Sequence, residues 1–225
     1  MELTKKQIQE IDNYITVCGI KYYDVKTEIV DHFASILELR LDENPDLDFK
    51  EAIIEEHKKF SDKGFNRLLE TKTKTIHNRF VKQTIINFKS FFKLPKIIIT
   101  ICCYLLLYKM MPYFNDVKTF FMVLTVFGFI LIFQLGIRIF ISYKQKKERF
   151  LALNRMTLFY QIASNMFILF NCILSFRTDK SFLNNGYNNI HLGVFVLILL
   201  LYWSMEYVYQ QNRKQIKKQY PNVFI

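Results

Sequence analysis

The run TFFMVLTVFGFILIFQLGI, residues 119–137, contains nineteen residues without a charged side chain. At about 1.5 Å rise per residue, a helix of this length nearly matches the ~30 Å thickness of the hydrocarbon core of a bilayer. Core helices of soluble proteins seldom contain an uncharged run of this length. The sequence therefore predicts a membrane span over residues 119–137.

The charges on the two sides of this span predict its orientation. Asp116 and Lys118 roughly cancel on one side, whereas Arg138 and the lysines and arginine of residues 144–149 crowd the other side. Basic residues in short loops stay on the cytoplasmic side of a membrane. We therefore expect residues 138–149 to be cytoplasmic.

Three further apolar runs predict spans over residues 94–114, 156–176 and 190–209. The first of these has the weakest pattern, because Lys96 and Lys109 bracket only twelve uncharged residues. Lysines near helix ends can extend to the interface, so this segment can still cross. Four spans place both termini in the cytoplasm, and we expect a multi-pass protein of the cell membrane.

The front and the back of the chain differ in charge. Residues 1–70 hold 16 Asp and Glu against 10 Lys and Arg, a net charge of −6, whereas residues 71–225 hold 4 against 21, a net charge of +17. The positive charges lie at the edges of apolar runs, which favours anionic lipid headgroups rather than nucleic acid as their partner.

The first 70 residues predict three amphipathic helices. Thr4 and Gln7 form a capping box for a helix over residues 5–18, and Gly19 ends it. A second helix ends before Pro45, and a third runs from about residue 49 until Gly64. Because three apolar stripes can be buried against one another, we expect a cytoplasmic three-helix domain over residues 1–70.

Residues 71–93 predict a basic amphipathic stalk helix at the headgroup boundary, with an apolar stripe through Ile76, Phe80, Thr84, Phe88 and Phe92. The alternative is a helix packed on the soluble domain. The predicted fold class is all-α: an integral membrane four-helix bundle over residues 94–209, with a small N-terminal helical domain and a basic cytoplasmic tail over residues 210–225.

The segment EIVDH places Glu28, Asp31 and His32 within one helical turn. Carboxylates and imidazoles at this spacing can bind a metal, and the weak metal alternative combines Glu28, His32 and His57. The structural interpretation places His32 at the edge of the helical core in a hydrogen bond. The acids, with Asp24 one turn earlier, are then solvated or cap neighbouring helix ends. The four cysteines form no C-x-x-C pair, so no zinc site, disulfide framework or cofactor is indicated.

The chain lacks the H-E-x-x-H, G-x-S-x-G and P-loop motifs, so we expect a protein that is not an enzyme. Inside the predicted spans, Gln161 and Asn165 lie one helical turn apart, and amides of this kind join helices by hydrogen bonds. An isolated carboxylate is costly at this depth, so we expect Glu206 to pair with Arg138 or Arg155. The candidate intramembrane polar residues are Gln134, Arg138, Arg155, Gln161, Asn165 and Glu206.

The run GIKYYDVKTEIVDHFASILE, residues 19–38, precedes a proline-containing turn and an FKEAI helix. This region resembles the N-terminal helical domain of an uncharacterised group of bacterial multi-pass membrane proteins. It is more distantly similar to the HAAS-type helical domains that precede membrane spans. The resemblance rests on Tyr23, Glu28, Asp31 and His32, and it implies a signalling role of the kind found beside PadR-like transcription regulators, without catalytic residues.

These observations predict a non-enzymatic regulatory or interaction module tethered to the membrane. Its acidic helical domain is expected to bind a cytoplasmic protein partner through Tyr22, Tyr23, Glu28, Asp31 and His32. The alternative function is a small transporter or channel-like protein, with a polar path formed by Gln134, Gln161, Asn165 and Glu206 among the spans.

Overall fold

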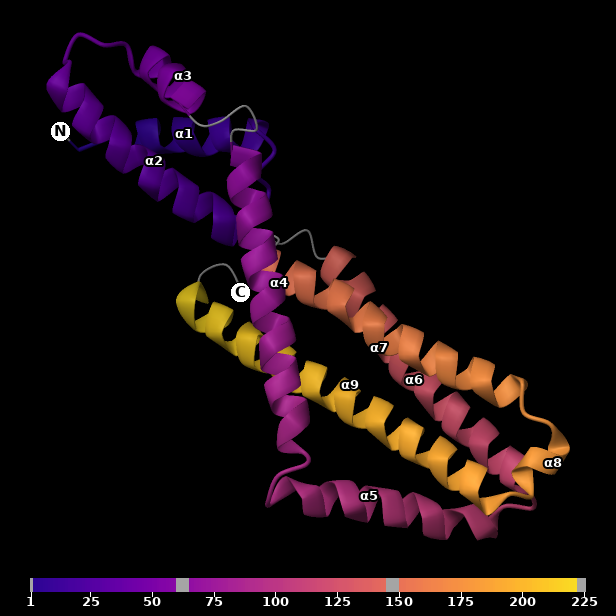
Figure 1. Cartoon of the computed structure of the whole chain (residues 1–225). Helices are drawn as coiled ribbons and strands as arrows, with labels where there is room; N and C mark the ends of the chain where they lie inside the picture. Colours follow the sequence, from indigo (N-terminus) through magenta and orange to yellow (C-terminus); the bar gives the residue numbers. More distant parts are fainter. Residues whose placement is uncertain (1, 60–64, 145–149, 222–225) are drawn as a thin grey trace. The chain divides into compact units, whose positions relative to one another are not determined.

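The computed structural model describes residues 2–59, 65–144 and 150–221, and these residues fold almost entirely into α-helices (Figure 1). The described residues contain no β-strand, which confirms the predicted all-α class. The chain forms two compact units. The N-terminal unit comprises Met1–Asn78 and Lys147–Arg155, and the bundle unit comprises Arg79–Lys146 and Met156–Ile225.

The N-terminal unit contains the three predicted helices. They are α1 (Lys5–Val17), α2 (Tyr23–Glu43) and α3 (Phe49–Lys59). The predicted capping box starts α1, because Thr4 Oγ1 accepts the Gln7 N–H at 3.3 Å and Gln7 Oε1 accepts the Thr4 N–H at 2.9 Å. Gly19 has a φ of +97°, the left-handed conformation expected after the helix. Gly64, the predicted end of the third helix, lies outside the described residues.

The core of the N-terminal unit extends beyond the predicted boundary at residue 70. That boundary falls inside α4 (Phe65–Ser90), whose first residue packs edge-to-face on Phe33 with ring centroids 5.6 Å apart. Ile76 also packs against this core, and Leu151 from the start of α7 (Leu151–Ser175) is fully buried in it. The unit therefore needs residues that follow the predicted spans 94–114 and 119–137.

The bundle unit contains the remaining helices, and four helices of the chain are long and apolar enough to cross a membrane, as predicted. Their apolar windows are Lys96–Tyr113, Val117–Gln134, Leu151–Ser175 and Asn185–Gln219. The elements are α5 (Lys96–Met110), η1 (Met111–Tyr113), α6 (Val117–Lys144), α7, α8 (Asp179–Phe182) and α9 (Asn185–Gln219).

Two features of this unit differ from the prediction. The loop predicted between the last two spans contains the short helix α8. Helix α9 continues ten residues beyond the predicted end at residue 209, so much of the predicted tail is helical. Buried residues recur at helical spacing through Val208, Tyr209 and Asn212, and they extend the packed face of the helix.

Part of the apolar stripe predicted for the stalk over residues 71–93 packs on protein in the second half of α4, and the location of the stalk at the headgroups stays a prediction. Phe80 and Thr84, from the predicted stripe, are 1% and 2% exposed. Gln83 Oε1 accepts a hydrogen bond from Asn212 Nδ2 at 3.1 Å, and Asn87 Nδ2 donates to the Ser204 carbonyl at 3.5 Å. These contacts fasten α4 to α9 within the bundle unit.

The side chain of Phe167 on α7 packs against Gly128 on α6. A Cβ atom at this position would lie 2.7 Å from Cδ1 of Phe167, whose side chain is only 4% exposed. Gly128 therefore makes room for the Phe167 ring.

We expect Gly128→Val to lower the stability of the bundle unit by about 1–3 kcal/mol, because the added methyl groups overlap the buried Phe167 ring. Thermal unfolding in detergent, followed by circular dichroism, measures this effect. Gly136→Val is the matched control on the same helix, because a Cβ there meets nothing within 4 Å. Equal losses in the two variants would contradict the close packing at Gly128.

Candidate functional site

Asp24 caps the start of α7 from across the N-terminal unit. Its Oδ1 accepts the Leu151 N–H at 2.9 Å, and its Oδ2 accepts the Ala152 N–H at 3.3 Å. Oδ1 also accepts the N–H of Val25 at 3.1 Å, so a single carboxylate serves the first turns of α2 and α7. The first N–H groups of a helix lack partners within it, and a carboxylate satisfies them and complements the helix dipole.

The two tyrosines before Asp24 hold the neighbouring residues of α7. Tyr22 Oη accepts a hydrogen bond from Asn154 Nδ2 at 2.7 Å. The ring of Tyr23 packs edge-to-face with Phe150, with centroids 5.7 Å apart. Three consecutive residues thus contact the segment 150–154. We call this set of contacts the α7 clamp.

Burial governs the electrostatics of the clamp. Removal of the Asp24 carboxyl from water raises its pKa above 3.8, and this effect outweighs the backbone N–H donors, which act in the opposite direction. The native clamp therefore holds a proton on Asp24 more readily than the unfolded chain does.

The five residues predicted to bind a partner separate into three groups. Tyr22 and Tyr23 belong to the α7 clamp, as described above. Glu28 accepts hydrogen bonds from Lys72 Nζ of α4 at 2.6 Å on both oxygens, an ion pair within the N-terminal unit. Asp31 and His32 are exposed to solvent. These last two remain accessible on the outward side of α2.

An apolar residue extends this accessible surface. Leu39 is 68% exposed and lies seven residues after His32, which places both on one side of α2. Ser35, between them, is also exposed. We call this set, Asp31, His32, Ser35 and Leu39, the outer α2 face.

The structure does not assemble the metal site considered from the sequence. Nδ1 of His57 lies 2.7 Å from Tyr14 Oη, and its ring stacks on Phe65 at 4.5 Å between centroids. Glu28 is paired with Lys72, and His32 points to solvent. Among the described residues, no group of three or more His, Cys, Asp or Glu side chains could hold a metal ion. His57 instead contributes to packing.

Glu206 lies in a small polar cluster of the bundle unit. Its carboxylate accepts hydrogen bonds from Tyr160 Oη at 2.8 Å and from Gln210 Nε2 at 2.7 Å. The side chain of Arg138 lies outside the described residues, and Arg155 belongs to the N-terminal unit. The pairing of Glu206 with either arginine stays a prediction.

The amides expected to join the helices face outward. Gln134, Gln161 and Asn165 are all exposed, and the described part of the bundle gives none of them a hydrogen bond to another helix. They occupy the side of α6 and α7 away from the packed residues, such as Ala163 and Phe167. The sequence indicated the correct residue type but not the direction in which it points.

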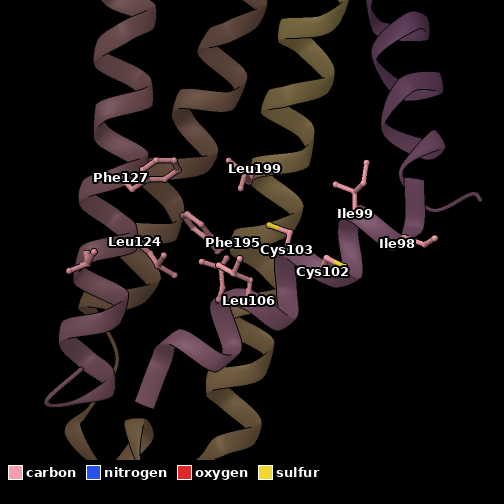
Figure 2. A pocket seen from close by; sticks show the side chains of 11 residues that line it. Ile98, Ile99, Cys102, Cys103, Leu106, Leu124, Phe127, Phe195 and Leu199 are labelled. Atoms are coloured by element: carbon pink, nitrogen blue, oxygen red, sulfur yellow. The ribbon is translucent and has the colours of Figure 1, made fainter. Parts of the chain in front are cut away.

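A cavity of about 620 Å³ lies in the bundle unit between α5, α6 and α9 (Figure 2). The residues of the predicted polar path, Gln134, Gln161, Asn165 and Glu206, do not line it. This cavity offers no polar path for a transported solute. Its lining residues are Ile98, Ile99, Cys102, Cys103, Leu106, Leu107, Val123, Leu124, Phe127, Phe195 and Leu199.

A second polar cluster was not predicted from the sequence. Arg177, after α7, donates from Nη2 to Asn188 Oδ1 at 2.6 Å and to the Ser181 carbonyl at 2.9 Å. Its guanidinium lies 4.1 Å from the centroid of the Phe182 ring. These contacts fix α7, α8 and α9 to one another at this end of the bundle. The interacting side chains lie on α8, on α9 and after the end of α7, so no regular spacing in the sequence indicates that they form a cluster.

We expect Asp24→Ala to cost about 0.5–2 kcal/mol, because the first N–H groups of α7 lose their acceptor. The local measurement is amide hydrogen exchange, which should become faster at Leu151 and Ala152. Asp31→Ala is the control, since Asp31 is an exposed acid on the same helix. Unchanged exchange in Asp24→Ala would show that the cap does not protect α7.

The raised pKa of Asp24 predicts a pH dependence. Its contribution to stability is fully present below the unfolded pKa of 3.8, and it is lost as pH rises through the higher folded pKa. Relative to Asp24→Asn, which does not titrate, the wild type should therefore lose stability as pH rises through this window. Denaturant unfolding of both proteins across the window measures the difference. A wild type that gains stability relative to Asp24→Asn as pH rises would contradict the raised pKa.

Comparison of the chain with protein-family models, with curated proteins and with solved structures finds no match in any of the three. The likeness of residues 19–38 to HAAS-type domains stays a prediction from the sequence.

Proposed function

We propose that this chain is a multi-pass membrane protein that acts as a non-enzymatic regulatory module, and that its N-terminal unit binds a cytoplasmic protein partner. The observation that carries the proposal is the α7 clamp, in which the first residues of α2 cap the first turn of a candidate membrane span. The same helix α2 also presents an accessible surface. Binding on α2 can therefore influence a helix of the bundle.

Membrane insertion is supported by the apolar surface of the bundle unit. Phe133 is 70% exposed and Ile168 is 46% exposed, and both belong to helices long enough to cross a bilayer. Large apolar surfaces are rare on soluble monomers, whereas lipid covers them without cost. The basic residues around 138–149 and after residue 210 favour a cytoplasmic location for both termini.

The outer α2 face supplies the chemistry for a protein partner. An exposed leucine can enter an apolar pocket, while Asp31 and His32 beside it can form polar contacts at the rim. The imidazole of His32 and the carboxylate of Asp31 favour a partner surface with both donors and acceptors. This combination suits reversible protein binding.

The link from this face to α7 runs through a single helix. Asp31 and His32 lie two turns after Asp24 on α2, and Glu28 between them is held by Lys72. A partner that shifts or rotates α2 acts on the cap of α7 through the same rigid element. The regulatory output is then a change in how firmly the first turn of α7 is held.

We expect Leu39→Asp to weaken capture of the partner from a lysate at least tenfold, since a charge replaces the exposed apolar contact. Capture on the full-length protein in detergent, quantified by mass spectrometry, measures the loss. Ile54→Asp is the matched control, an equal change at a residue of α3 that is 47% exposed. The proposal fails if both variants capture the same proteins in the same amounts as the wild type.

A further inference from the structure

The cavity between α5, α6 and α9 has a purely apolar lining. Figure 2 shows Leu106 and Cys103 of α5 beside Phe195 of α9, with Leu124 and Phe127 on α6 closing the other side. The lining contains aliphatic, aromatic and thiol groups, and no charged, amide or hydroxyl side chain. The part of a ligand that enters this cavity must therefore be a hydrocarbon, and a volume of about 620 Å³ can hold a hydrocarbon chain.

Helix α5 leaves this space because it packs sparsely. It has no buried residue, and it packs mainly against α9, whereas its contact with α6 is slight. Leu106 is 59% exposed even though it lines the cavity. The cavity is thus an open groove along one side of α5, accessible from the surrounding apolar phase.

One end of the groove carries a cation. Phe195 and Leu199, which line the groove, share a stripe of α9 with Trp203 and Tyr207 at intervals of four residues. The Nζ atom of Lys96, at the start of α5, lies 5.9 Å from the centroid of the Tyr207 ring. Tyr207 follows Leu199 by about 12 Å along the helix axis.

The ammonium of Lys96 has only neutral partners in the described part of the chain. Nζ donates to Ser90 Oγ at 3.0 Å and to Asn87 Oδ1 at 3.4 Å, and it lies 5.2 Å from the centroid of the Phe91 ring. Aromatic rings beside a lysine are typical of the membrane interface. Lys89 and Lys93, nearby in the chain, are exposed and add positive charge. This end of the groove therefore attracts an anion.

We propose that the groove binds one anionic phospholipid, with an acyl chain along α5 and the phosphate beside Lys96. The inference rests on the membrane insertion in the proposed function, but it does not depend on the protein partner of α2. A phospholipid combines the two required features, a hydrocarbon chain and an adjacent negative charge. The bound chain supplies α5 with the packing neighbour that α6 does not provide.

A second copy of the chain is the competing occupant, and the chemistry of the groove favours lipid. A helix from another copy would bring side chains of fixed shape into a groove that has no polar group to orient them. A partner helix would also leave Lys96 without an anion unless it carried an acid at the membrane boundary. Acids are scarce in the bundle unit, because residues 79–146 and 156–225 contain only three, Asp116, Asp179 and Glu206.

The test uses the full-length protein in detergent, incubated with phosphatidylglycerol or with phosphatidylcholine of identical acyl chains, and native mass spectrometry counts the lipids retained. We expect one phosphatidylglycerol to be retained about fivefold better than phosphatidylcholine. Lys96→Gln should remove that preference, whereas Lys109→Gln, at the other end of α5, should preserve it.

A groove-filling variant tests the acyl-chain site. Leu106→Trp should abolish retention of both lipids, while Ile101→Trp, on the same helix at 50% exposure but outside the groove, should leave it unchanged. Thermal unfolding confirms that both variants fold. Equal retention in Leu106→Trp and wild type, or a protein dimer that Leu106→Trp abolishes, would overturn the lipid assignment. Partner capture through Leu39 would still stand in that case, whereas solubility without detergent would overturn both proposals.

Discussion

The backbone N–H groups at the start of α7 need a hydrogen-bond acceptor, and the N-terminal unit supplies it through Asp24. A helix that starts inside a protein cannot leave these donors unpaired without a cost of about 1–3 kcal/mol each. The carboxylate, Tyr22 and Tyr23 together bind residues 150–154, and Leu151 completes the apolar core of the unit. The N-terminal unit is therefore not closed by its own first 78 residues.

The bundle unit follows a different principle, in which one helix provides most of the packed surface. Helix α9 is buried over much of its length, including Leu192, Phe195 and Leu200, and it also holds the second half of α4 through Asn212. Helix α5, by contrast, has no buried residue. The difference between these two helices creates the groove that we assign to lipid.

Local patterns in the sequence predicted most of the helices and where they begin. Helical periodicity, the Thr4 capping box and uncharged runs identified the first three helices and the four candidate spans. The sequence allowed the acids near His32 to cap a neighbouring helix end, but it did not single out Asp24 or α7, because the capped residue Leu151 lies 127 residues away. The outward direction of Gln161 and Asn165 was also missed, since one helix alone does not show which side its neighbours cover.

The burial of Leu151 in the N-terminal core has a consequence for biosynthesis. Leu151 is 0% exposed, yet the ribosome adds it only after the helices α5 and α6 have been made. Until then, the nascent N-terminal region has an incomplete core, and Asp24 lacks the two N–H donors of α7. Maturation of this region thus awaits translation of the first two candidate spans, and the order of synthesis sets the order of assembly.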